Sequence, residues 1–196
     1  MNNVRAQFVC PTGWLGSVVG MLMAFKNRER SEWVLSQLGV KPGDRVLEIG
    51  FGPGVDVART AASGASVAGI DPSEVMVRQA SRRNAHAIRS GRVDLRRGAM
   101  PDLPFVDRSF DKAYSINSYQ FWPSKTRALA ELRRVLRPGG LVIIAVQPRN
   151  KGATDVTAKA TGEQMMEALS EAGFGAVNVR LRPMSPVATA CAVATK

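Results

Sequence analysis

The chain has 196 residues, of which 45% are hydrophobic and 22% charged. It can therefore bury a substantial core, and the composition excludes a disordered chain. Lysine and arginine number 27 against 16 aspartate and glutamate, so the net charge is +11 and attracts anions of any kind. Cys10 and Cys191 lie at opposite ends of the sequence and no metal-ligand spacing occurs, which predicts a reduced, cytoplasmic, metal-free protein and leaves one disulfide as the alternative.

An apolar segment, WLGSVVGMLMAF, occupies residues 14–25. It is too short to span a bilayer, and no small-x-small cleavage site follows it. Val18, Val19, Leu22 and Met23 recur at helical spacing. The pattern predicts a helix of the mature protein with one buried face.

From about residue 28 the pattern alternates between helices and strands. We expect helices over 28–40, from about 55, over 72–88 with Pro72 and Ser73 in capping positions, over 125–140 and over 162–172. We expect strands over 45–49, 65–71, 93–96, 109–116, 141–146, 176–184 and 186–196.

Regular β–α–β alternation predicts right-handed crossovers and a doubly wound, Rossmann-like α/β fold. We expect a mainly parallel seven-stranded sheet with helices on both faces, and an antiparallel edge hairpin formed by the last two strands. No repeat or long linker interrupts the chain. A single domain over 1–196 is therefore predicted, with a core over 41–146 and a C-terminal helix and hairpin over 147–196.

The glycine-rich stretch VLEIGFGPG, residues 46–54, follows the first predicted strand. A bare backbone there lets a ligand approach closely and meet the N–H groups of the next helix. The glycines are spaced GxGxG, whereas the dinucleotide fingerprint GxGxxG needs a glycine where Val55 stands, which disfavours a dehydrogenase. Asp71 ends the second strand, where a carboxylate can bind ribose hydroxyls; its alternative role is to cap the following helix.

Four segments in order, VLEIGFGPG, GIDPS, GAMPDLPFVDRSFDKAYSIN and LAELRRVLRPGGLVIIA, resemble the successive motifs of class I S-adenosylmethionine-dependent methyltransferases. The resemblance covers about 41–146 and is nearest to the small-molecule group that includes ubiquinone and menaquinone biosynthesis enzymes (methyltransferase type 11). It implies S-adenosyl-L-methionine as cofactor, bound by the 41–146 core. The cofactor-binding residues it implies are Glu48, Gly50, Gly52, Gly54, Asp71, Pro72, Met76, Ala99, Met100 and Asn117.

Within this resemblance, Glu48 would orient the glycine loop, Asp71 would bind the ribose, and Asn117 would offer its carbonyl to the amino group of the cofactor. Many relatives carry an acidic residue where this chain has Ala99, and that residue reads the adenine amino group. Here backbone groups or Asp102 would have to replace it.

The stretch NSYQFWPS, residues 117–124, is the predicted acceptor side. Tyr119 and Trp122 could stack on a flat substrate or hold a cationic amine, although Trp122 is better explained as packing under the next helix. Tyr119 and Asn117 are the candidates for catalysis. Residues 1–30, including Trp14, would form a helical lid over the acceptor, as such segments do in relatives.

The lone histidine, His86, falls within a predicted helix away from the strand ends, so we expect no histidine base. The leading hypothesis is in-line methyl transfer to a small, aromatic or lipophilic acceptor, with peripheral membrane contact and a homodimer both compatible with the sequence. Nucleic acid is disfavoured because no aromatic-lined basic stripe is visible. The alternatives are an RNA or protein methyltransferase recruited by its basic surface, and a non-catalytic nucleotide-binding module.

Overall fold

The computed structural model describes residues 28–196, and its backbone contacts divide the chain into two units, 1–99 and 100–196. The predicted helix over 14–25 and the lid residue Trp14 lie outside the described residues. No helix in the described part of the chain is long and apolar enough to cross a membrane.

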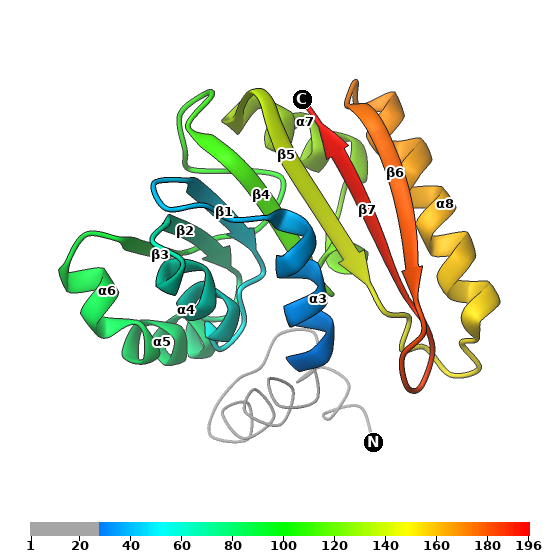
Figure 1. Cartoon of the computed structure of the whole chain (residues 1–196), viewed down its shortest axis with the longest axis horizontal. Coiled ribbons are helices and arrows are strands. Elements are labelled where there is room, and N and C mark those ends of the chain that lie inside the picture. Colours follow the sequence, from blue (N-terminus) through cyan, green and yellow to red (C-terminus); the bar gives the residue numbers. More distant parts are fainter. Residues whose placement is uncertain (1–27) are drawn as a thin grey trace. The chain divides into compact units, whose positions relative to one another are not determined.

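The first unit contains three parallel strands, with β2 (Ser66–Asp71) between β1 (Arg45–Ile49) and β3 (Val93–Arg97). Its helices are α3 (Arg28–Leu38), α4 (Val55–Ala62), α5 (Glu74–Arg83) and α6 (Ala85–Arg89). Helices α4 and α5 contact each other and the strands, and α6 contacts β3 (Figure 1). Phe51, Val57, Val67, Ala80 and Val93 form the buried cluster between these layers.

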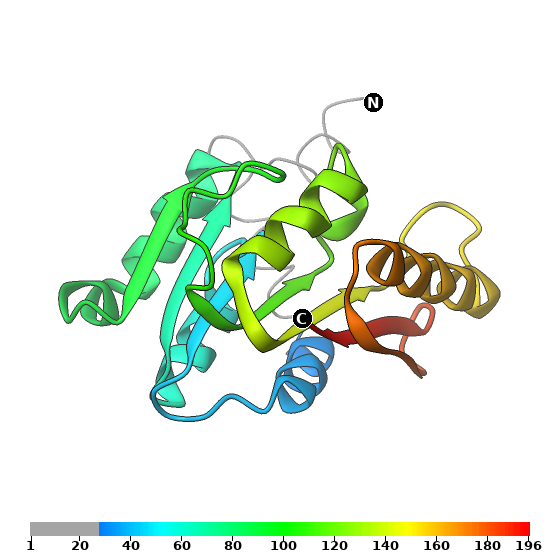
Figure 2. The same cartoon turned by 90° about the horizontal axis from the view of Figure 1, so that it is seen from above.

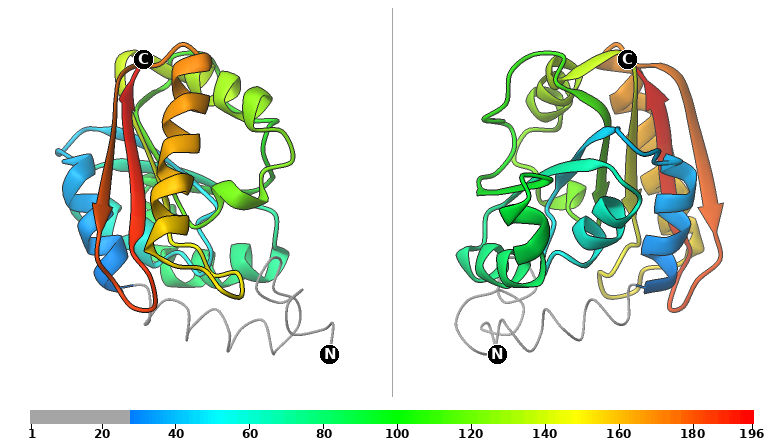
Figure 3. Two further views of the ribbon diagram at one scale, coloured as in Figure 1. Left: turned by 90° about the vertical axis from the view of Figure 1, so that its right-hand side faces the viewer. Right: turned by 60° about the vertical axis from the view of Figure 1, so that its left-hand side comes forward.

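The second unit begins with β4 (Phe110–Ile116), the short 3₁₀ helix η1 (Tyr119–Phe121), α7 (Lys125–Val135) and β5 (Leu136–Val146). It continues with α8 (Asp155–Glu171), β6 (Gly175–Arg182) and β7 (Thr189–Thr195). Strands β4 and β5 are parallel, whereas β7 pairs antiparallel with both β5 and β6. Helix α8 runs along β6 and β7 (Figure 2) and lies beside α7 (Figure 3).

The seven strands have the order β3-β2-β1-β4-β5-β7-β6. This confirms the predicted α/β class, with a mainly parallel sheet and an antiparallel C-terminal hairpin. The last strand in sequence, β7, is inserted between β5 and β6, so that β6 forms the edge. Burial explains this order, because Ala190, Cys191, Ala192 and Ala194 of β7 are buried, whereas most residues of β6 are exposed.

The predicted continuous helix over 72–88 is wrong at Asn84, where the chain breaks into α5 and α6. The Asn84 side chain donates to the carbonyls of Gly54, at 3.0 Å, and Ala80, at 2.9 Å. A short amide side chain that bonds to nearby backbone competes with helical hydrogen bonds, so it interrupts the helix there.

Two other helix boundaries differ from the prediction. Helix α7 ends at Val135 rather than at the glycines, because Leu136 already pairs with Phe110 of β4. In addition, the helical conformation is disfavoured for the residue that directly precedes a proline. Helix α8 begins at Asp155, seven residues earlier than expected from the sequence, where Thr154 and Thr157 form a capping box.

Candidate functional site

The glycine loop directly follows β1 and leads into α4. Gly50, Gly52 and Gly54 all have positive φ angles, of 76°, 52° and 73°. The loop is tied to the neighbouring strand because the Gly50 amide donates to the Ile70 carbonyl at 2.8 Å. Gly54 is the N-cap of α4 and provides no side-chain cap, so the first amides of the helix remain available to a ligand.

The glycines of this loop serve different purposes. A Cβ atom on Gly54 would lie 2.6 Å from Cβ of Ala80, so the absence of a side chain lets α5 pack against the loop. A Cβ atom on Gly52 would meet nothing within 4 Å. Open space therefore lies beside Gly52, and this cradle is where we expect a bound cofactor.

Asp71 lies at the carboxyl end of β2 and is only 6% exposed. One carboxylate oxygen accepts the Gly52 amide and the other accepts the Ser73 amide, both at 2.9 Å. Burial raises the pKa of Asp71 above its ordinary value, and the two amide donors partly offset that effect. Each oxygen keeps a further lone pair, so the carboxylate can hold the glycine loop and still accept ribose hydroxyls.

The other predicted cofactor residues of the first unit differ in exposure. Glu48 in β1 is 3% exposed and engaged in a polar contact. Met76 is 3% exposed, whereas Pro72 is exposed. Pro72 is therefore the more accessible of the two predicted adenine neighbours.

The loop after β3 is attached to the same carboxylate residue, since the Gly98 amide donates to the Asp71 carbonyl at 3.1 Å. Ala99 is exposed and Met100 is 4% exposed. The side chain of Asp102, the proposed substitute for an acidic adenine contact, is 85% exposed and pairs with Arg127 at 3.4 Å. Such an exposed ion pair has no fixed geometry for reading a purine, so backbone groups are the better substitute.

In the second unit, Asn117 follows β4 with a φ of 55°, which is uncommon for a residue other than glycine. Its Oδ1 accepts the Gln147 amide at 2.8 Å, and its carbonyl accepts Nε2 of Gln120 at 3.0 Å. The side chain is therefore committed to joining the carboxyl ends of β4 and β5. The carbonyl retains one lone pair, which favours the carbonyl over the side chain for a ligand contact.

Tyr119 and Trp122 pack against each other, with ring centroids 5.1 Å apart. Trp122 is 6% exposed and its indole nitrogen donates to Oγ of Ser118 at 3.3 Å, which favours a packing role. Tyr119 is 8% exposed, yet its hydroxyl makes no hydrogen bond within residues 28–196. Burial raises the pKa of Tyr119, so this phenol is protonated at neutral pH.

Lys125 lies beside this aromatic pair, on the predicted acceptor side. Its ammonium nitrogen lies 5.0 Å from the centroid of the Tyr119 ring and donates to the Trp122 carbonyl at 2.7 Å. Partial burial lowers the pKa of Lys125. Lys125 was not predicted from the sequence, although a lysine at the first position of a helix, where cations are unfavourable, was a usable signal.

His86 is exposed on α6. No group of three or more residues able to bind a metal ion occurs among the residues that the structure describes. Within the first unit the structure brings Asp71 and the glycine loop together, and within the second unit it brings Tyr119, Trp122 and Lys125 together.

The strand order is Rossmann-like, with the glycine loop after β1 and Asp71 at the end of β2. Together with the family match that follows, it makes the protein a methyltransferase that uses S-adenosylmethionine. Residues 47–144, half of the chain, match the model of the methyltransferase domain family, and the protein belongs to that family.

Similarity to known proteins extends beyond this core. An uncharacterized methyltransferase of Bacillus subtilis, YdaC, is 33% identical over 91% of this chain and 98% of its own length. The O-methyltransferase resE of Aspergillus sclerotiorum is 29% identical over 89% of this chain and 71% of its own length. Phosphoethanolamine N-methyltransferase 2 of Haemonchus contortus, solved with S-adenosyl-L-methionine, superposes with a TM-score of 0.71 at 20% identity, covering 86% of this chain and 52% of that chain.

Proposed function

We propose that the protein transfers the methyl group of S-adenosylmethionine to a small aromatic or lipophilic acceptor that binds beside η1. The observation that carries this proposal is Tyr119, whose ring is buried while its hydroxyl has no partner in the described chain. A buried aromatic ring with an unpaired polar tip is suited to orienting a flat acceptor that carries a heteroatom.

When bound, the cofactor supplies an electrophilic sulfonium methyl. The glycine loop and Asp71 would hold its adenosyl part, and the Asn117 carbonyl would accept a hydrogen bond from its amino group. The protein then has mainly to align the acceptor for in-line displacement, and orientation of this kind can lower a barrier by about 7–11 kcal/mol.

The charge around Tyr119 favours an oxygen nucleophile. Lys125 already lies over the Tyr119 ring, so the ring face is occupied by a cation and would repel a cationic amine. The same ammonium would attract a phenolate or carboxylate. The similarity to an O-methyltransferase supports the same choice, and phenols are the class to test first.

The nucleophile would need no histidine base. His86 is exposed on α6 of the first unit, and no other histidine occurs in the sequence. A phenol would lose its proton to water, favoured by the positive charge of Lys125, and the phenolate would then take the methyl group as S-adenosylhomocysteine leaves. The Tyr119 hydroxyl would donate a hydrogen bond to it and fix its direction.

The proposal is tested by incubating the full chain with S-adenosylmethionine and matched sets of phenols, carboxylic acids and amines. Formation of S-adenosylhomocysteine and the mass of the methylated product are measured. We expect turnover with phenols and little with amines of the same size. Turnover confined to RNA or protein substrates would support recruitment by the basic surface instead, and tight cofactor binding without turnover would support a non-catalytic module.

A further inference from the structure

The loop that joins β3 to β4, residues 98–109, carries the predicted contacts to the purine of the cofactor. It starts at Asp71, through the Gly98 amide, and passes at once through Ala99, which has no polar side chain. Pro101 and Pro104 lack amide hydrogens, which further limits what the loop can offer. Recognition of a purine edge here depends on where a few backbone groups lie.

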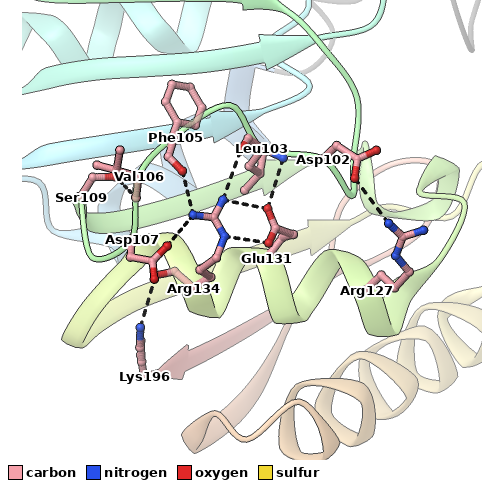
Figure 4. A network of polar contacts seen from close by, with 10 residues as sticks. All are labelled: Asp102, Leu103, Phe105, Val106, Asp107, Ser109, Arg127, Glu131, Arg134 and Lys196. Atoms are coloured by element: carbon pink, nitrogen blue, oxygen red, sulfur yellow. Dashed lines mark hydrogen bonds and ion pairs between the residues drawn. The ribbon is translucent and has the colours of Figure 1, made fainter.

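One guanidinium holds the later part of this loop, residues 103–107. Arg134 of α7 donates to the Leu103 carbonyl at 3.1 Å, the Phe105 carbonyl at 2.8 Å and Oδ1 of Asp107 at 2.7 Å. The same group forms a two-point pair with Glu131, at 2.7 and 2.8 Å (Figure 4). Glu131 in turn accepts the Leu103 amide at 3.3 Å.

The Arg134–Glu131 pair is less exposed to solvent than the Arg127–Asp102 pair of the same helix. The side chains of Arg134 and Glu131 are 30% and 28% exposed, compared with 71% and 85% for Arg127 and Asp102. Arg134 lowers the pKa of Glu131, and its two carboxylate partners raise the pKa of Arg134. The planar guanidinium of Arg134 makes five contacts with acceptors. Together they fix both the position and the orientation of the loop groups that it binds, which a lysine could not do.

We propose that Arg134, braced by Glu131, is a positioning residue for adenine recognition, which this chain achieves through the backbone of residues 98–109 because Ala99 supplies no carboxylate. The network uses the amide of Leu103 and the carbonyls of Leu103 and Phe105 on the side of α7. The backbone of Ala99, Met100 and Asp102 remains for the purine. This inference rests on the placement of adenine beside residues 99 and 100 in the proposed function.

The test combines two substitutions, Arg134→Gln and Ala99→Asp, separately and together. Binding is measured by calorimetry for S-adenosylhomocysteine and for S-ribosylhomocysteine, which lacks the purine. Arg133→Gln is the matched control, because Arg133 is an exposed residue on the same helix that donates to the Gly173 carbonyl outside the loop.

We expect Arg134→Gln to weaken S-adenosylhomocysteine binding about tenfold and to leave S-ribosylhomocysteine binding unchanged. Ala99→Asp should strengthen S-adenosylhomocysteine binding about fivefold through a charge-assisted contact and recover part of the loss in the double variant. With any acceptor that turns over, KM for S-adenosylmethionine should rise while kcat at saturation stays constant.

Equal loss of both ligands in Arg134→Gln would overturn the proposal, because it would show a general structural role. Unchanged binding of S-adenosylhomocysteine would also overturn it. If Arg134→Gln does not fold, Asp107→Asn removes one exposed contact of the network and is held to the same expectation. No effect of Ala99→Asp in either background would instead show that the adenine placement is wrong, and none of these binding tests depends on the acceptor.

Discussion

The proposed cofactor side of the first unit and the proposed acceptor side of the second unit are built from different kinds of contact. Around the glycine loop, main-chain amides and carbonyls make the bonds, as with the Gly52 and Ser73 amides on Asp71. Around η1, side chains bond both to each other, as Ser115 to Ser118 at 2.6 Å, and to main-chain carbonyls, as Lys125 to Trp122 at 2.7 Å. Backbone contacts fix one ligand shape whatever the neighbouring residues, whereas side-chain contacts change with each substitution. This explains how one fold keeps its cofactor and varies its acceptor.

The glycines of the first unit give the strongest test of this contrast. Gly54→Ala should lower the free energy of unfolding by about 3 kcal/mol, because the new methyl group collides with Ala80 and the residue keeps a left-handed φ of 73°. Gly52→Ala should cost only about 1 kcal/mol for its backbone conformation, since nothing obstructs the methyl group. Urea unfolding measures both changes.

Affinity for S-adenosylhomocysteine should rank these two variants in the opposite order, with the larger loss in Gly52→Ala. The methyl group of Gly52→Ala occupies the cradle, so its affinity for S-adenosylhomocysteine should fall even where the protein is fully folded. Calorimetry on the folded variant provides the comparison. Wild-type affinity in Gly52→Ala would mean that the loop does not hold the cofactor.

Asp71→Asn is expected to have the next largest effect. It should weaken S-adenosylhomocysteine binding about a hundredfold, because two ribose hydroxyls lose a charged acceptor. Burial raises the pKa of Asp71 above its ordinary 3.8, so the folded protein holds this proton more tightly than the unfolded chain. Protonation therefore stabilises the ligand-free fold as the pH falls through the raised pKa, while it removes the acceptor that the cofactor needs.

Affinity should accordingly decline on acidification at a pH above that ordinary value, and Asp71→Asn should abolish this dependence. The measurement is the dissociation constant of S-adenosylhomocysteine as a function of pH in both proteins. A parallel decline in the variant would assign the titration to another group.

On the acceptor side, Tyr119→Phe should lower kcat about tenfold with a phenolic acceptor, because the acceptor loses one orienting hydrogen bond. Cofactor affinity should stay constant, since the ring and its contacts with Trp122 and Lys125 remain. Trp122→Phe is the control for packing and should mainly lower thermal stability. Loss of cofactor affinity in Tyr119→Phe would contradict the division between the two sides.

Much of the cofactor side could be predicted because short local patterns determine it. The first strand, the glycine turn and Asp71 all lie within 27 residues, from 45 to 71, and each has its own backbone requirement. The contacts of Arg134 with the loop could not be predicted in this way, because the loop partners lie 27 to 31 residues away and any of several arginines in α7 would satisfy the same pattern.

In helix α8, a glycine that packing requires led to a wrong prediction of where the helix begins. Gly162 suggested a helix start, yet it lies within the helix, where a Cβ atom would approach Cγ1 of Val179 to 2.7 Å. The glycine is there to let α8 lie close to β6. Only the partner strand reveals this, because an isolated glycine in a helical pattern ordinarily signals a terminus or a weak point.

His86→Ala should have the smallest effect. An exposed side chain on α6 contributes little to stability, and changes at such positions usually stay within about 0.5 kcal/mol. The pH–rate profile with a phenolic acceptor should keep its shape, because the ionisation that matters belongs to the acceptor under the influence of Lys125. Lys125→Met should shift that profile toward higher pH, since the phenolate loses its neighbouring cation. If His86→Ala removed an ionisation near neutral pH, the proposal that the nucleophile needs no histidine base would be wrong.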